Sequence, residues 1–128
     1  MYNKNSMKLL ASILVYFYFI SVSFASMSFY QEALDNFEKN IVFNPKSSES
    51  YILLGKSYSA MDNVDKANKY FKMAYTLIPE NVELNYLLGE ASYNLGLIEE
   101  YAEYLSNLEI ICPVNCDEID KLKKLSTE

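Results

Sequence analysis

The sequence of 128 residues contains no histidine and no arginine, and it has only two cysteines. Without histidine, the chain lacks the commonest general base and metal ligand at neutral pH. Two cysteines alone do not supply the four soft or imidazole ligands of a structural zinc site. Carboxylates are numerous, but their spacing marks no convergent catalytic pair. We therefore expect a protein that is not an enzyme and that needs neither a metal nor a cofactor.

Glycine and proline are also scarce, with three residues of each, whereas 51% of the chain is apolar. This composition is globular and offers few helix-breaking positions. It predicts a single helix-rich domain.

The first 25 residues differ from the rest because Lys4 and Lys8 are their only charges and a long apolar run follows. This pattern, with small residues at its end, predicts a secretory signal (1–25) cleaved after Ala25, which leaves a mature domain of residues 26–128. Two alternatives stay open. The run is nearly long enough to remain as a membrane anchor, or it could form a buried first helix. We expect membrane contact only if the segment is retained.

The charge balance is acidic, with 11 lysines against 17 carboxylates. Removing Lys4 and Lys8 leaves nine lysines and a net charge of −8. Such a surface repels phosphate backbones, so we expect no nucleic-acid binding. No basic residue lies between Lys72 and Lys121, although many acids do. This acidic stretch is either a solvated helical surface or a docking face for a basic partner.

A repeat of 34 residues organises the chain. Pro45, Pro79 and Pro113 follow one another at this spacing, and so do Gly55 and Gly89. Aligned on these residues, the segments around them superpose as helix–turn–helix units with apolar stripes at helical spacing. The period predicts two full repeats at 48–81 and 82–115, a partial repeat at 28–47 and a capping helix at 116–128.

The repeats resemble the tetratricopeptide repeat (TPR) family, whose unit carries a W-x₂-L-G-x₂-Y…A-x₃-F…P pattern. The matching residues are Tyr51, Leu54, Gly55, Tyr58, Ala67, Phe71, Ala74 and Pro79 in one repeat, and Leu88, Gly89 and Pro113 in the next. The resemblance implies an all-α fold, a right-handed stack of antiparallel helix pairs. We expect about six helices after the signal segment, near 27–43, 48–60, 63–77, 82–94, 97–111 and 116–126.

Two local features of these helices are predicted from the residues. A glycine inside a helix costs about 1 kcal/mol relative to alanine. We expect Gly55 to offset that cost by letting the partner helix approach closely over Ala67. Asn115, followed by Glu118 three residues later, predicts a capped start for the last helix.

Cys112 and Cys116 lie on either side of the break before this last helix. In an exported protein two such cysteines are expected to form a disulfide, which would fix the last repeat to its cap. A reactive thiol is a more distant alternative, because Cys116 would lie at a helix N-terminus, where a thiolate is favoured.

The resemblance assigns partner binding to a concave face formed by the first helix of each repeat. The corresponding residues are Glu49, Ile52, Lys56, Ser59, Glu83, Tyr86, Glu90 and Tyr93. Exposed tyrosines flanked by carboxylates could hold a segment with basic and apolar side chains. The alternative is that Tyr86 and Tyr93 pack against neighbouring helices. Ile52, Leu53 and Tyr86 occupy positions where the clamp for chaperone tails would need polar residues, so a carboxylate-terminal ligand is not expected.

Together these features predict an exported scaffold that binds a protein or peptide in the periplasm or cell envelope. The first alternative is a membrane-anchored structural module of an envelope assembly. A thiol redox protein is a distant third. The sequence does not identify the partner or the oligomeric state.

Overall fold

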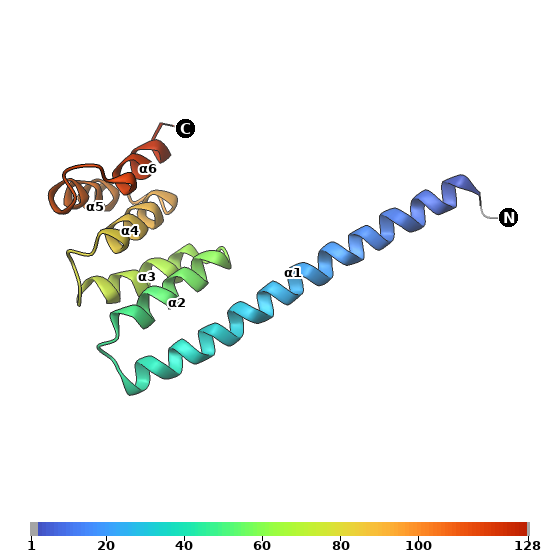
Figure 1. Ribbon diagram of the computed structural model, residues 1–128, viewed down its shortest axis with the longest axis horizontal. Helices are drawn as coiled ribbons and strands as arrows, with labels where there is room; N and C mark the ends of the chain where they lie inside the picture. The colour runs from blue at the N-terminus through green and yellow to red at the C-terminus, as the bar shows by residue number, and fades with distance from the viewer. Residues whose placement is uncertain (1–2, 128) are drawn as a thin grey trace.

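The computed structural model describes residues 3–127, which form six helices and no strand. The helices are α1 (Lys4–Phe43), α2 (Ser48–Ala60), α3 (Val64–Tyr75), α4 (Val82–Asn94), α5 (Ile98–Ile111) and α6 (Asp117–Leu125). Figure 1 shows α2 to α6 stacked in chain order, while α1 extends far beyond the stack. The predicted all-α stack of helix pairs is confirmed, and the bounds of α2 and α4 match the expected ranges.

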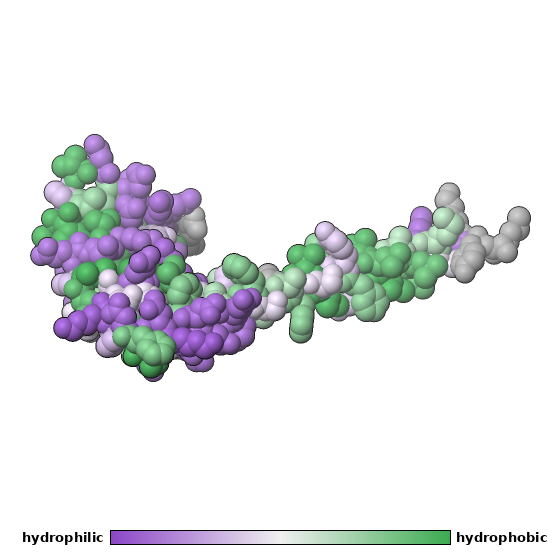
Figure 2. All heavy atoms as spheres, turned by 60° about the horizontal axis from the view of Figure 1, so that its bottom comes forward, coloured by the Kyte–Doolittle hydropathy of each residue, from purple (hydrophilic) through white to green (hydrophobic). Residues whose placement is uncertain are grey.

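The first helix is longer than expected because the apolar segment and the helix predicted at 27–43 form one unbroken α1 of 40 residues. No glycine or proline interrupts the stretch around Ala25, and its alanine, serine and aromatic side chains all tolerate helical geometry. The first half of α1 contacts no other helix, and its apolar side chains are exposed along the rod in Figure 2. Whether the chain is cleaved after Ala25 stays a prediction.

Two clusters of apolar side chains form the core. The larger cluster lies between helices α1 to α5, to which α5 contributes Tyr104, and includes the fully buried Leu54, Phe71 and Leu84. The smaller one joins α4, α5 and α6 around Leu108 and Leu122. Each helix pair therefore buries its apolar stripe against the next one, as a repeat stack requires.

Short polar caps set where three of the helices begin. The side chains of Ser47, Asn63 and Asn81 each accept a hydrogen bond from a backbone N–H in the first turn of α2, α3 and α4. The predicted cap of the last helix is wrong. Asn115 has a φ of 54° and belongs to the preceding turn, and Cys116 occupies the N-cap position of α6 without a side-chain cap bond.

Both helix-interior glycines lie at close contacts, although the contacts differ from the predicted one. A Cβ added at Gly55 would meet the ring of Phe71 at 2.3 Å, so the approach is over Phe71 and not over Ala67. A Cβ at Gly89 would meet Leu122 of α6 at 2.6 Å. Close approach of the paired helix, the expected reason for keeping a glycine, is thus present at Gly55, whereas at Gly89 the close neighbour is the capping helix α6.

Candidate functional site

A shallow groove lies between the first helices of the two full repeats. Its volume is about 320 Å³, and its lining consists of Ser48, Glu49, Ile52, Leu53, Lys56, Ile78, Asn81 and Glu83. Ile52, Leu53 and Ile78 supply an apolar floor, and Glu49 and Glu83 are exposed at the rim. Of the eight residues predicted for the concave face, the structure brings four together here: Glu49, Ile52, Lys56 and Glu83.

An ion pair crosses the groove from one repeat to the other. The Lys56 ammonium donates to Glu83 Oε1, and both side chains are about half exposed. Such a pair in water contributes little to stability, typically about 0–1 kcal/mol. With Lys56 neutralised, the carboxylate of Glu49 remains, so the groove keeps a negative charge.

The other four predicted residues do not line this groove. Ser59 is exposed near the end of α2, whereas Tyr86 and Tyr93 are half-buried in the cluster that α6 closes. The ring centroids of Tyr93 and Tyr101 lie 5.4 Å apart. Tyr86 and Tyr93 therefore pack against neighbouring helices and are not freely exposed. This is the alternative that the sequence left open for them.

The environment of Tyr86 favours its neutral form. Burial, together with the adjacent carboxylate of Glu90, raises the pKa of the Tyr86 hydroxyl to about 12. That hydroxyl donates a hydrogen bond to Glu90 Oε1 at 3.0 Å. Tyr86 therefore acts as a hydrogen-bond donor at neutral pH, and its hydroxyl keeps the Glu90 side chain close to the surface of α4, the helix that carries both residues.

Cys112 and Cys116 are free thiols in the structure, and Cys116 is buried. A hydrogen bond with the Cys116 thiol raises the pKa of Cys112 to about 11. The Cys116 thiol also donates to Glu118 Oε2 at 3.6 Å. A nucleophilic cysteine needs a lowered pKa, so this environment disfavours Cys112 as a reactive thiol. The disulfide stays a prediction.

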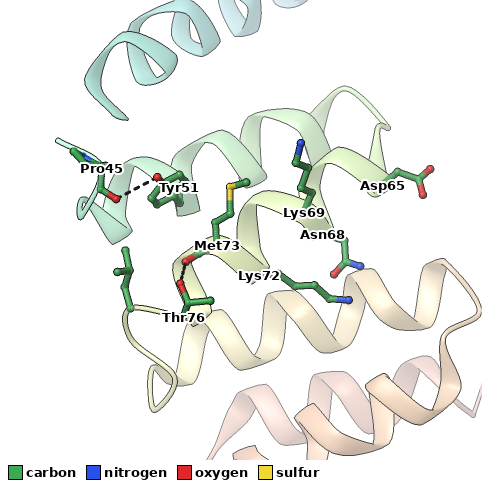
Figure 3. Close-up of a pocket in the computed structure, with 9 residues that line it drawn as sticks. Pro45, Tyr51, Asp65, Asn68, Lys69, Lys72, Met73 and Thr76 are labelled. Atoms are coloured by element: carbon green, nitrogen blue, oxygen red, sulfur yellow. Dashed lines mark hydrogen bonds between the residues drawn. The ribbon is translucent and has the colours of Figure 1, made fainter. Parts of the chain in front are cut away.

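A second hollow, of about 640 Å³, lies over α3 and contains none of the eight predicted residues. Figure 3 shows Asn68, Lys69 and Lys72 of α3 on one side of it, and Tyr51 with its hydrogen bond to the Pro45 carbonyl on the other. Lys72 is already paired with Glu100 at 2.7 Å. The sequence does carry a signal for this hollow, because Lys69 and Lys72 recur at helical spacing along α3, but the repeat pattern directs attention to the other helix of the pair.

Solved structures with the same arrangement of helices are known. The first TPR domain of Spaghetti (RPAP3), bound to the HSP90 peptide SRMEEVD, superposes with a TM-score of 0.69 at 20% identity, covering 78% of this chain and 79% of that one. TTC0263, a thermophilic TPR protein of Thermus thermophilus, gives 0.69 at 19% identity, covering 79% and 52%. The chain has the tetratricopeptide-repeat fold.

Two further comparisons show how much of each matched protein this chain covers. The TPR-fold chain also matches the Yersinia enterocolitica type III secretion chaperone SycD, solved with a peptide of the translocator YopD, with a TM-score of 0.65 at 15% identity over 98% of this chain and 90% of that one. BBSome complex member BBS4 of Bos taurus is 29% identical over 96 residues, which are 75% of this chain. The chain spans only 18% of the length of BBS4. No protein-family model matches it.

Proposed function

We propose that this protein is a non-enzymatic adaptor that binds a segment of another protein in the groove between α2 and α4. The observation that carries the proposal is the convergence of Glu49, Ile52, Lys56 and Glu83 from two successive repeats on one hollow. An apolar floor under an acidic rim suits a segment that carries apolar and basic side chains, since complementary charge steers and orients a partner.

The structural neighbours support a peptide ligand. The solved structures of RPAP3 and SycD are complexes with peptides, one from HSP90 and one from YopD. The HSP90 peptide is rich in acidic residues, as its sequence SRMEEVD shows. Our groove has the opposite preference, because its unpaired charge is the carboxylate of Glu49. We therefore propose that this chain binds a peptide in a related way, and that its peptide carries basic rather than acidic side chains.

Charge reversal at the rim tests this proposal. An array of short peptides with varied lysine and leucine content is probed with the full chain, and we expect the bound set to combine lysines with leucines. Glu49→Lys combined with Glu83→Lys should remove that set. The matched control is Glu99→Lys with Glu103→Lys, which makes the same change of net charge on α5, outside the groove.

Retention of the lysine–leucine peptides by the control, and their loss from the groove variant, would support the proposal. Equal loss from both variants would show that net charge alone attracts the peptides. Selection of acidic peptides by the native chain would contradict the proposed ligand chemistry. The two tyrosines are less suitable test positions, because their packing under α6 makes Tyr86→Ala and Tyr93→Ala structural changes.

For the place of action we propose the periplasm or cell envelope, reached through the apolar first half of α1. Among the described residues, α1 alone is long and apolar enough to cross a membrane. A second candidate, a membrane-anchored module, is favoured by one observation, that α1 runs unbroken through Ala25. Intact mass distinguishes them: a chain that starts at Ser26 supports export with cleavage, and a chain that starts at Met1 in the membrane fraction supports the anchor.

A further inference from the structure

One face of α1 is not fully covered by other helices, although the equivalent face of α3 is fully buried. At the spacing of 34 residues, Ala33 and Phe37 of α1 correspond to Ala67 and Phe71 of α3. Ala67 and Phe71 are 0% and 1% exposed, and α3, which carries them, packs against both α2 and α4. Ala33 and Phe37 are only half-buried, and α2 is the one helix that packs extensively against α1 among the described residues. The partial repeat lacks the first helix that would cover this face.

The same spacing identifies residues that match the missing helix. Shifted by 34 positions, α2 falls on residues 14–26. There Phe17, Ile20, Ser21 and Phe24 take the places of Tyr51, Leu54, Gly55 and Tyr58. An aromatic, an aliphatic, a small residue and a second aromatic thus recur in register. All four are exposed in the structure. A signal or an anchor needs apolar residues but does not need this order of sizes.

The chain is poorly suited to fold these residues back onto its own Ala33 and Phe37. In the two full repeats, the turn between paired helices contains a residue in the left-handed region, Asp62 at φ 58° and Gly96 at φ 73°. Glycine, and to a lesser degree aspartate, adopts that conformation readily. The equivalent residue in the first repeat is Ser28, and it lies inside the unbroken α1. The straight helix carries residues 14–26 away from their own repeat (Figure 1).

We propose that residues 14–26 of a second copy of this chain cover Ala33 and Phe37, so that two copies complete each other's first repeat. The two α1 helices run antiparallel. Because Gly55 contacts Phe71, Ser21 of one copy lies against Phe37 of the other. Ser21 carries the Cβ that Gly55 lacks, so the half-buried Phe37 ring must shift from the position that the Phe71 ring takes. The two-fold axis then passes close to position 29, midway between them. Each copy both donates and receives the same segment, which is the self-complementary contact that a closed two-fold dimer requires.

The dimer requires a chain that retains residues 14–26, so it is incompatible with cleavage after Ala25, and it does not depend on the peptide groove. Lipid is the competing occupant of the same apolar residues. The two occupants make different demands on the helix. A bilayer contacts all sides of α1 equally, whereas the dimer buries Phe24 and leaves Val22 outside, since Val22 corresponds to the exposed Lys56 of α2.

Cross-linking tests the contact directly, in full chains in which Cys112 and Cys116 are replaced by serine. One chain carries Ser21→Cys, another carries Phe37→Cys, and the mixture is treated with a short bismaleimide. We expect a cross-linked pair containing one chain of each kind. Either chain treated alone should give no pair, because positions 21 and 37 are about 24 Å apart along a straight helix and equivalent positions do not meet across the axis.

A chain that carries both substitutions distinguishes the second copy from a hairpin. The proposal expects chains linked in pairs, whereas a linked monomer would show that the segment folds back onto its own repeat and would overturn it. Light scattering on full chains with Phe24→Asp or Val22→Asp provides an independent measurement. Phe24→Asp should weaken dimerisation at least about a hundredfold, since it buries an unpaired charge, and Val22→Asp should leave it nearly unchanged.

Three other results would overturn the proposal. Equal effects of the two aspartate substitutions would indicate unspecific apolar association. Monomers that partition into phosphatidylcholine vesicles, without a cross-link between positions 21 and 37, would assign the segment to lipid. A purified chain that begins at Ser26 would show that the segment is removed. The circular dichroism of the stack serves as the folding control for every variant.

Discussion

Replacing Gly55 by alanine tests whether the close contact with Phe71 explains a glycine in the middle of α2. By helix propensity alone, Gly55→Ala should stabilise the protein by about 1 kcal/mol. The structure predicts the opposite sign. The new Cβ would lie 2.3 Å from the ring of Phe71, which is 1% exposed and cannot swing into solvent. Overpacking of a tight core costs about 1–3 kcal/mol, so the net result is a destabilisation of up to about 2 kcal/mol.

The assay is thermal and urea unfolding of four chains: native, Gly55→Ala, Phe71→Leu and the double variant. In a domain of this size, each kcal/mol shifts Tm by roughly 4–8 °C. Phe71→Leu removes ring atoms at the contact, so it should be less harmful in the Gly55→Ala background, with a coupling free energy of about 0.5–3 kcal/mol. A stabilised Gly55→Ala chain with no coupling to position 71 would refute this explanation of the glycine.

Three further substitutions have expected outcomes. Asn81→Ala removes the side-chain cap of α4 and should cost about 1 kcal/mol in urea unfolding, and an unchanged midpoint would contradict the cap. Tyr101→Phe deletes a buried hydrogen bond to the Leu122 carbonyl and should cost about 0.5–1.5 kcal/mol, with faster amide exchange in α6 than in α2. Tyr86→Phe should make the free energy of unfolding decrease less steeply with rising pH in the alkaline range. The raised pKa of Tyr86 stabilises the fold below pH 10.0, and this contribution disappears as the pH rises toward about 12. Equal pH profiles of the native and Tyr86→Phe chains would oppose that assignment.

The repeat made much of the fold predictable. Equal spacing of prolines and glycines defines one helical unit, and an apolar stripe at helical spacing defines its buried face. The observed bounds of α2 and α4 follow from Ser47 and Asn81, which cap them. The cap predicted at Asn115 is wrong because a capping pattern does not reveal whether its first residue has left-handed φ.

The candidate site was predictable only in part. The residues that belong to consecutive first helices, such as Ile52 and Glu83, do meet in a groove. The position of α6 could not be inferred from the period, because a capping helix lies outside the repeat. Its Leu122 contacts Gly89 and closes the cluster that contains Tyr86 and Tyr93. The hollow over α3 was also missed, because it combines a loop, a neighbouring helix and the outer side of α3.

The sequence alone determined the helical period, the paired helices and the acidic surface, because each depends on residue types at short and regular separations. The tertiary structure decided what lies against each glycine, which tyrosines are covered and which face of α1 is left open. These properties depend on how far helices from different repeats approach one another, and that distance is set by all the side chains packed between them. The half-exposed Phe37 and the buried Phe71 show the difference: the same residue at the same place in the repeat has a different environment because one of them lacks a neighbouring helix.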